Sequence, residues 1–319
     1  MRSVQVVQVR RITGRCNLFT SEMRYHRRLA IIDAPSNLGL KLPSHGREPG
    51  VRYMPAVLRE HGLFTRLQAE DSGTILPPPY ADFVDSETNV RNAHAVRDYS
   101  LKLAEGIRQL LDGAFFPIVL GGDCSILLGS ALALRRKGCF GLLFIDGHTD
   151  LLTPESSETG GVAGMDLALV TGTGPRLLTS IDDLTPYIRP IDVALLGYRW
   201  PDPTSQSVAL PVEPMTALPL EVIRRYGAHY AAAKALEHFE QRSFWLHVDV
   251  DVLNPVWMPA VDSPDPGGMN PDELLIIVRS AIQSLRCIGM EITIYDPTLD
   301  PARHGARLIV DLLSKALQE

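Results

Sequence analysis

Three short stretches combine acidic residues with histidine or cysteine, which are residue types that bind metal ions. They read Gly-Gly-Asp-Cys-Ser at 121–125, Asp-Gly-His-Thr-Asp at 146–150 and His-Val-Asp-Val-Asp at 247–251. Ionised carboxylates gathered in one place repel one another unless protons or cations neutralise them. Mostly oxygen ligands with an imidazole suit manganese, and shared carboxylates suit two ions about 3.5–4 Å apart. The pattern therefore predicts a two-metal site built on Asp146, Asp150, Asp249 and Asp251.

Each stretch follows an apolar run that is typical of a buried strand. Further strands are expected from the residue pattern, and helices are expected between them. Strands that are apolar on both faces and alternate with helices predict a parallel sheet between two helix layers. The carboxyl ends of such strands are where α/β proteins bind ligands. If the backbone stays extended, the acids at i, i+2 and i+4 point to one side, so two rows would face each other. The expected strands are 29–33, 116–120, 141–145, 191–196, 244–248 and 288–294.

The rest of the chain reads as one α/β domain over residues 27–319. A proline-rich stretch at 198–218 is expected to be a surface loop. Residues 1–26 are expected to be an extension, which is flexible or begins upstream of a natural start at Met23; a weak transit-peptide interpretation stays open. The expected helices are 55–60, 89–111, 125–136, 227–241, one that begins at 271, and 303–317.

Taken singly, several residues of the three stretches have an ordinary structural explanation. Asp123 fits a helix N-cap. His247 is more often a hydrogen-bonded core residue than a ligand. Cys124 is either a small buried apolar residue or a metal ligand. Only the combined aspartates and His148 are hard to explain without metal.

Composition narrows the function further. The 319 residues carry a formal net charge of -6 and no block of lysine or arginine, which disfavours nucleic-acid binding. No apolar run reaches the roughly 18 to 20 residues of a membrane span. The four cysteines form no CxxC pair, which favours a reducing cytoplasm.

In their order along the chain, the three motifs resemble those of the arginase/agmatinase (ureohydrolase) family. Its members carry Gly-Gly-Asp-His-Ser, Asp-Ala-His-x-Asp and Ser-x-Asp-x-Asp-x-x-Asp-Pro. The likeness runs from about Leu29 to the C-terminus, with a Gly-Val-x-x-x-Pro-Ala-Val-Leu-Arg stretch at 50–59 and Met290-Glu291 at a strand end. It implies a three-layer αβα fold with a mostly parallel sheet of about eight strands, and a trimer or hexamer.

The resemblance also implies a reaction and roles for residues. A hydroxide that bridges two divalent ions, manganese before iron, cobalt or zinc, would attack a small-molecule guanidine and release urea or a urea analogue. Asp146 and Asp249 would bridge the ions, and Glu291 would orient the cationic group of the substrate. The implied ligands are Cys124, Asp146, Asp150 and Asp249 for the first ion, and Asp146, His148, Asp249 and Asp251 for the second.

Several positions depart from the family pattern. Cys124 replaces a histidine ligand and weakens the preference for manganese relative to zinc, iron or cobalt. His247 replaces a serine, Gly147 an alanine and Asn254 an aspartate. Ala163 stands where the family has a proton-shuttling histidine, and general acid–base help is worth about 10²- to 10⁴-fold. A substrate with a better leaving group, such as an N-hydroxylated guanidine, would need that help less.

A cysteine-bearing subgroup, which includes an Nω-hydroxyarginine amidinohydrolase of D-cycloserine biosynthesis, resembles the chain more closely. The loop 153–159 occupies the substrate-recognition position of the family, where Glu155, Ser157 and Glu158 are expected to hold a substrate amine; a solvated loop is an equal interpretation. Two further functions stay open. One is a catalytically silent binding or regulatory protein, and the other is a formiminoglutamase-like hydrolase of another linear amidine or amide.

Overall fold

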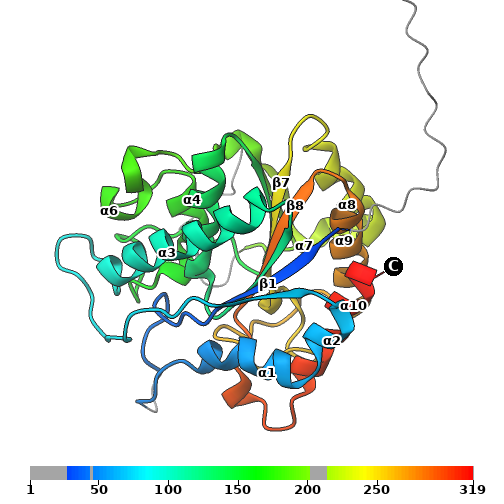
Figure 1. Ribbon diagram of the computed structural model, residues 1–319, viewed down its shortest axis with the longest axis horizontal. Helices are drawn as coiled ribbons and strands as arrows, with labels where there is room; N and C mark the ends of the chain where they lie inside the picture. The colour runs from blue at the N-terminus through cyan, green and yellow to red at the C-terminus, as the bar shows by residue number, and fades with distance from the viewer. Residues whose placement is uncertain (1–26, 44–45, 202–213, 319) are drawn as a thin grey trace, which may run out of the picture.

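Eight parallel strands form one sheet in the computed structural model, which describes residues 27–43, 46–201 and 214–318 (Figure 1). The strand order is β2-β1-β3-β8-β7-β4-β5-β6. The first three strands form one half of the sheet, and β8 and β7 lie in the middle between β3 and β4. The expected extension at 1–26 lies outside the described residues. The strands are β1 Leu29–Ala34, β2 Glu70–Thr74, β3 Phe116–Gly121, β4 Gly141–Ile145, β5 Val193–Leu196, β6 Thr216–Leu218, β7 Phe244–Asp249 and β8 Cys287–Thr293.

Alternation along the strands creates two apolar cores, one on each face of the sheet. In β4, Leu142 and Phe144 belong to one core, and Leu143 and Ile145 belong to the other. Because strand side chains alternate in direction, a run that is apolar at every position buries both faces. This confirms the predicted three-layer α/β architecture.

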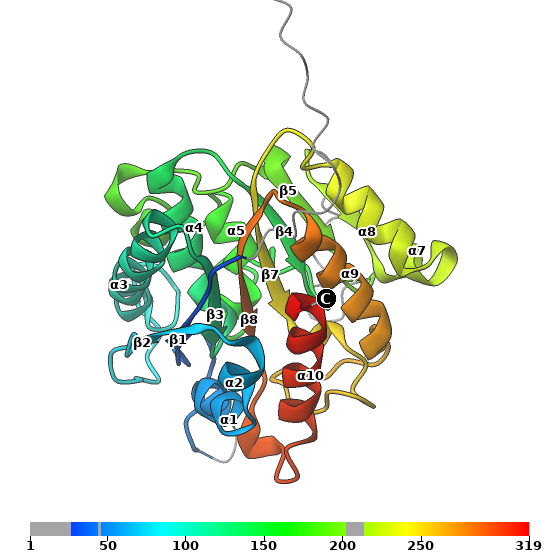
Figure 2. The same cartoon turned by 45° about the vertical axis from the view of Figure 1, so that its right-hand side comes forward.

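Helices α3 and α4 cover one face of the sheet, whereas α1, α2, α8, α9 and α10 cover the other (Figures 1 and 2). None of the helices in the described ranges is long and apolar enough to cross a membrane. The helices are α1 Met54–Glu60, α2 Leu63–Leu67, α3 Ala93–Asp112, α4 Leu127–Lys137, α5 Asp166–Val170, α6 Arg176–Thr179, α7 Leu220–Tyr226, α8 Ala228–Glu237, α9 Pro271–Gln283 and α10 His304–Gln318.

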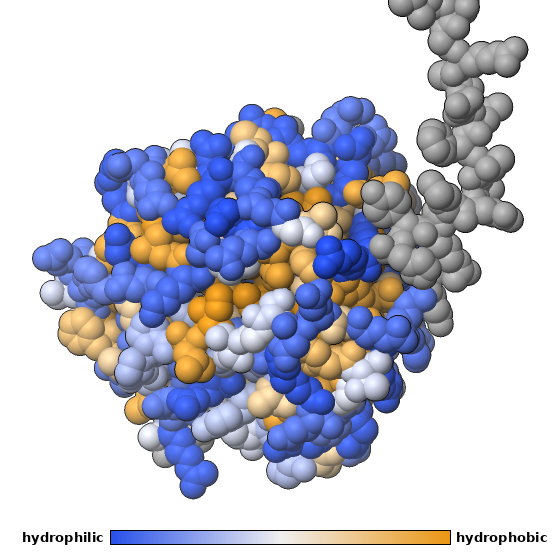
Figure 3. All heavy atoms as spheres, viewed as in Figure 1, coloured by the Kyte–Doolittle hydropathy of each residue, from blue (hydrophilic) through white to orange (hydrophobic). Residues whose placement is uncertain are grey.

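The outer surface follows from the amphipathic pattern of these helices. Hydrophilic residues cover much of the face shown in Figure 3, with hydrophobic residues visible in patches between them. In α3, buried residues such as Val96, Leu103 and Ile107 recur at helical spacing and face α4 and the sheet. The covering helices therefore leave polar sites to the ends of the strands, and the three motifs lie at the carboxyl ends.

The sequence pattern does not predict two of the strands, β2 and β6. β2 is polar and mostly exposed, and β6 is only three residues long. β6 pairs with β5 inside the stretch that was expected to be only a surface loop, so that prediction is wrong for residues 216–218. Edge strands need to bury only one side or none, so the apolar signal that marks central strands is missing.

Candidate metal centre

The three predicted motifs meet at the carboxyl edge of the sheet. β8, β7 and β4 are neighbours in the sheet, and β3 lies next to β8, so the ends of β3, β7 and β4 converge. A cavity of about 680 Å³ opens there. Five of the six residues expected to bind metal line it, namely Cys124, His148, Asp150, Asp249 and Asp251. The sixth, Asp146, is fully buried beside His148.

The first motif turns the chain sharply after β3. Gly122 is required there, because a Cβ atom would lie 1.6 Å from the backbone oxygen of Ser36. Asp123 accepts a hydrogen bond from Ser125 N at 2.8 Å and from Ser36 Oγ at 2.8 Å, so it is the N-cap that the sequence predicts. The turn directs Cys124 inward, where its Sγ lies 2.7 Å from Asp249 Oδ2.

The second and third motifs do not form the extended rows that the spacing suggested. The chain leaves β4 at Ile145, and Asp150 adopts a left-handed backbone with φ 49°. After β7, Asp249 caps the short 3-10 helix Val250–Val252 that carries Asp251. The carboxylates still converge, because turns and not extended strands aim them at the cavity.

His148 is clamped between carboxylates on both ring nitrogens. Its Nδ1 lies 3.0 Å from Asp251 Oδ2 and 3.7 Å from Asp146 Oδ1. Its Nε2 lies 2.9 Å from Asp265 Oδ2, a residue that the sequence analysis missed. A carboxylate on the second nitrogen is the usual support of a metal-binding histidine, because it fixes the tautomer and the ring orientation.

Burial and mutual repulsion shape the protonation of the site. Burial raises the pKa of Asp146 well above its usual range, and Asp150 and Asp251 raise it further. Burial, together with Asp251 and Asp146, also raises the pKa of Asp249. Burial acts to raise the pKa of Asp251, but His148, Arg199 and a hydrogen bond with Asp249 together lower it. Protons therefore take the place of cations in the metal-free site.

Burial and a neighbouring carboxylate also keep Cys124 protonated. Burial raises the pKa of the Cys124 thiol well above its ordinary value, and the Asp249 carboxylate raises it further. The thiol donates its hydrogen bond to Asp249 at 2.7 Å. A divalent ion would replace that proton and bind the thiolate.

Unsatisfied polar atoms test whether these residues fit metal ions. Asp146 Oδ2 is buried without a hydrogen-bond partner in the described part of the chain. The donor atoms of Asp146, His148 and Asp251 lie within 4.8 Å of one another. An oxygen-rich set with one imidazole and an orphaned carboxylate oxygen fits a divalent cation.

Glu291 is held between Ser130 and His247. It is fully buried on β8, where Ser130 Oγ donates to Oε2 and His247 Nδ1 lies 2.8 Å from Oε1. It is not among the described residues that line the cavity, whereas Ile294 is. Its side chain faces His247, its partner on β7, and its expected role in orienting the cationic group of a substrate stays a prediction.

Only part of the predicted recognition loop at 153–159 lines the cavity. Ser157 and Glu158 line the cavity. Glu155 is exposed and stands apart from the cavity wall, because the chain turns at Thr153, whose backbone oxygen accepts hydrogen bonds from the N–H groups of both Ser156 and Ser157. The prediction that Glu155 contacts a substrate in this cavity is therefore not supported by its position.

Other residues of the wall had no signal in the sequence. Lys41, Asp262 and Ser263 line the cavity, although they stand outside the three motifs. Ala163 lines it too and presents only a methyl group. Asp166, fully buried at the start of α5, was likewise missed. Only proximity in the fold identifies these residues.

Comparison with known proteins places the chain among well-described relatives. The arginase family model matches residues 27–318. Arginases from Staphylococcus aureus (strain COL) and Bacillus caldovelox are each 28% identical, over 89% and 91% of this chain and 94% and 98% of the respective relative. The native structure of the Bacillus caldovelox arginase superposes with a TM-score of 0.83 at 26% identity, and the match covers 92% of this chain and 99% of that chain.

Proposed function

The chain belongs to the arginase family, and from that premise we propose that it hydrolyses a guanidine C–N bond in a small molecule and releases urea or a urea analogue. Its relatives are named arginases, which are hydrolases that act on amidino C–N bonds. The observation that carries the proposal is His148, held by Asp265 on one nitrogen and facing Asp251 and Asp146 with the other. A histidine built in this way among buried carboxylates suits metal ligation.

We propose that two divalent ions, manganese before iron, cobalt or zinc, bind to this edge of the sheet. The ligands would come from Cys124, Asp146, His148, Asp150, Asp249 and Asp251. Bound there, the ions would lower the pKa of coordinated water into the range where it is a nucleophile at neutral pH. Asp265 orients the His148 ring, and Asp251 N fixes Asp249 through a 2.7 Å hydrogen bond to Oδ1.

The cavity wall supports a substrate that carries charges besides its guanidine. We propose that Ser157 and Glu158 hold a substrate amine and that Lys41 faces a substrate carboxylate, since all three line the cavity. An amino-acid-like guanidine meets both requirements. Glu291 supports the site indirectly through His247.

Ala163 favours a particular kind of guanidine. The wall offers a methyl group where the family resemblance implies a proton-shuttling histidine. We propose that the chain belongs to the cysteine-bearing subgroup and prefers an N-hydroxylated guanidine to an ordinary one. The rate with Nω-hydroxyarginine should then exceed the rate with arginine.

Assembly and compartment are proposals from the resemblance and the cysteines. We propose a trimer or hexamer, which light scattering on the purified chain would measure directly. Cys124, Cys139 and Cys287 are free thiols. Free thiols suit the reducing cytoplasm that the sequence predicts.

The test of the proposed function uses chelator-stripped protein reloaded separately with manganese, iron, cobalt or zinc. Each form is incubated with arginine, agmatine and Nω-hydroxyarginine, and the products are identified by mass spectrometry. Urea or hydroxyurea from one of the metal forms supports the proposal. No turnover by any form would instead support a silent binding protein, and formamide from a formimino substrate would support the formiminoglutamase-like alternative.

A further inference from the structure

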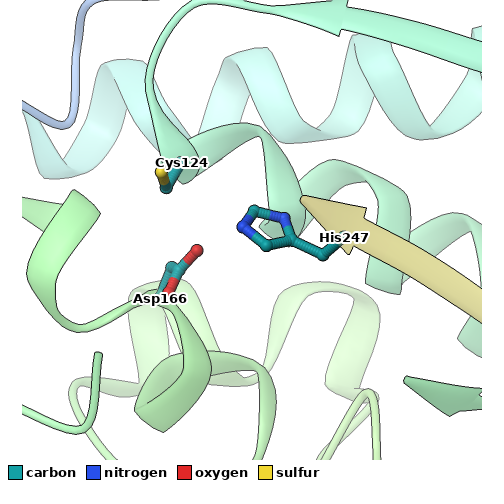
Figure 4. A group of neighbouring side chains, drawn as sticks. All are labelled: Cys124, Asp166 and His247. Atoms are coloured by element: carbon teal, nitrogen blue, oxygen red, sulfur yellow. The ribbon is translucent and has the colours of Figure 1, made fainter. Parts of the chain in front are cut away.

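A second group of potential ligands lies beside the carboxylates at the sheet edge. Cys124, Asp166 and His247 point toward one another from three different elements (Figure 4). Each offers one donor atom, and these atoms lie within 4.8 Å of one another. Cys124 follows β3, His247 lies on β7, and Asp166 begins α5. Of the three, only Cys124 belongs to the ligand set implied by the family resemblance.

Asp166 is the member of this group that most needs a partner. Its side chain is fully buried, and among the described residues its two carboxylate oxygens interact only weakly, with the backbone N–H of Leu167 and the carboxyl of Asp150. The neighbouring carboxyl of Asp150 interacts with it, but two ionised carboxylates there would repel each other. A buried carboxylate is costly unless a cation or a set of hydrogen bonds compensates it.

His247 is held in the orientation that a ligand needs. Its ring stacks on Phe144 with centroids 4.5 Å apart, and its Nδ1 lies 2.8 Å from Glu291 Oε1. Ser130 in turn donates to Glu291. The other nitrogen, Nε2, is buried and has no hydrogen-bond partner among the described residues. The carboxylate–histidine pair thus presents a free nitrogen to the group, as in metal sites.

We propose that Cys124, Asp166 and His247 together bind one divalent ion, which is the cysteine-bound ion of the proposed function. The inference rests on that proposed metal dependence, and it leaves Asp146, Asp150 and Asp249, which the resemblance implies for this ion, as ligands of the second ion only. Bonds of about 2.0–2.3 Å place donors within about 4.5 Å of one another, so small side-chain shifts close the site. A thiolate, an imidazole and a carboxylate favour zinc, cobalt or iron over manganese.

Glu291 then acts as a positioning residue. It touches neither the cavity nor the ion, but its bond to His247 Nδ1 leaves Nε2 to ligate. Substitution of such supporting carboxylates typically costs about 10- to 100-fold in metal affinity. This role accounts for a glutamate that is buried between a serine and a histidine.

The experiment is a cobalt titration of chelator-stripped protein, followed by the thiolate-to-cobalt charge-transfer absorption that only a sulfur-bound ion gives. Asp166→Asn keeps the shape of the side chain, and His247→Ser restores the residue that the family carries. Each should shift the appearance of the band to at least about tenfold higher cobalt concentration. Asp150→Asn removes a carboxylate of the set implied by the resemblance and should shift the band less than Asp166→Asn does. His238→Asn is a matched control, because His238 bonds to Thr216 far along the sheet.

Two results would overturn the inference. One is a wild-type protein that binds cobalt without the charge-transfer band. The other is a band that survives in Asp166→Asn and His247→Ser but disappears in Asp150→Asn, which would assign the ion to the set implied by the resemblance. Circular dichroism and melting of the metal-free variants establish that they are folded, and Glu291→Gln should give a smaller shift of the same sign.

Product assays on the same samples separate this inference from the proposed function. If only the proposed function fails, no guanidine is hydrolysed, yet the band appears and responds to Asp166→Asn. If only this inference fails, the wild-type protein releases urea or hydroxyurea, and the charge-transfer band appears at the same cobalt concentration in Asp166→Asn and His247→Ser as in the wild type.

Discussion

Four strands end in the same local turn. At or just after the end of each, an aspartate carboxylate accepts a hydrogen bond from the backbone N–H of the residue two positions further along. Asp123, Asp146, Asp249 and Asp296 all do so, at 2.6–2.8 Å. This local bond turns the chain immediately after the strand and leaves the second oxygen of the carboxylate for other contacts, as when Asp249 Oδ2 lies 2.7 Å from Cys124 Sγ. The same residue type therefore both ends the strand and supplies the chemistry.

Gly147 illustrates how tightly one of these turns is packed. A Cβ atom there would lie 1.9 Å from Arg199 Nη1 and 2.9 Å from the backbone oxygen of Asp251. Gly147→Ala should lower the free energy of unfolding by about 1–3 kcal/mol, because the arginine and the Asp251 turn must both move. Urea denaturation measures the change. Gly164→Ala is the control, since its nearest contact would be an ordinary 3.4 Å, and an equal loss in both variants would contradict the explanation.

Asp150 gives the metal-free protein a specific pH dependence. Burial raises the pKa of Asp150 well above its usual range, and Asp166 raises it further. A group with a raised pKa stabilises the folded state fully below its unfolded pKa of about 4, and that contribution is lost as the pH rises through the folded pKa. Asp150→Asn cannot ionise and should escape this loss.

The melting temperatures of wild type and Asp150→Asn, measured with chelator from about pH 5 to about pH 8, test the prediction. The melting temperature of the variant, relative to that of the wild type, should increase as the pH rises. A difference that stays constant across the range would show that Asp150 titrates normally in the folded protein.

At the scale of elements, the sequence located the central strands well because each is a short apolar run, and β3, β4 and β7 lead directly into a motif. It could not show where side chains point after those strands, because the turns at Asp146 and Asp249 replace the extended rows. The same limit applies to Glu291: counting along β8 cannot reveal that Ile294, with φ 76°, lines the cavity instead. Contacts such as that between Asp265 and His148 join distant loops and have no local signal.

Helix α9 is fixed at its start by a reciprocal cap. Asn270 Oδ1 accepts from Glu273 N at 2.9 Å, and Glu273 Oε2 accepts from Asn270 N at 2.8 Å. Asn270→Ala should cost about 1 kcal/mol of unfolding free energy without changing metal content. Asn270→Asp keeps the accepting oxygen and should retain the stability. Chemical denaturation of the three proteins decides, and an alanine variant as stable as the aspartate variant would contradict the prediction.

At the scale of the whole molecule, the sheet brings buried Asp146, Asp150 and Asp249 to one edge, and burial raises the pKa of each, so their ionisation opposes folding unless a cation compensates it. Metal ions that bind only the folded chain should stabilise it by about 2.7 kcal/mol per site at a hundredfold excess over the dissociation constant. Thermal melts should therefore fall with chelator and recover when manganese or zinc is restored. A melting temperature that does not respond to metal would contradict this.

The most direct test of a metal-dependent hydrolase is the comparison of wild type with Asp249→Asn, with bound metal and product release measured on the same samples. Asp249 contacts Cys124 and caps the turn that carries Asp251, so it links both groups of ligands. We predict two divalent ions per wild-type chain, and hydrolysis that falls at least about a hundredfold in the variant together with loss of bound metal. A wild type that binds no ion, or a variant that hydrolyses its guanidine at the wild-type rate, would contradict the assignment.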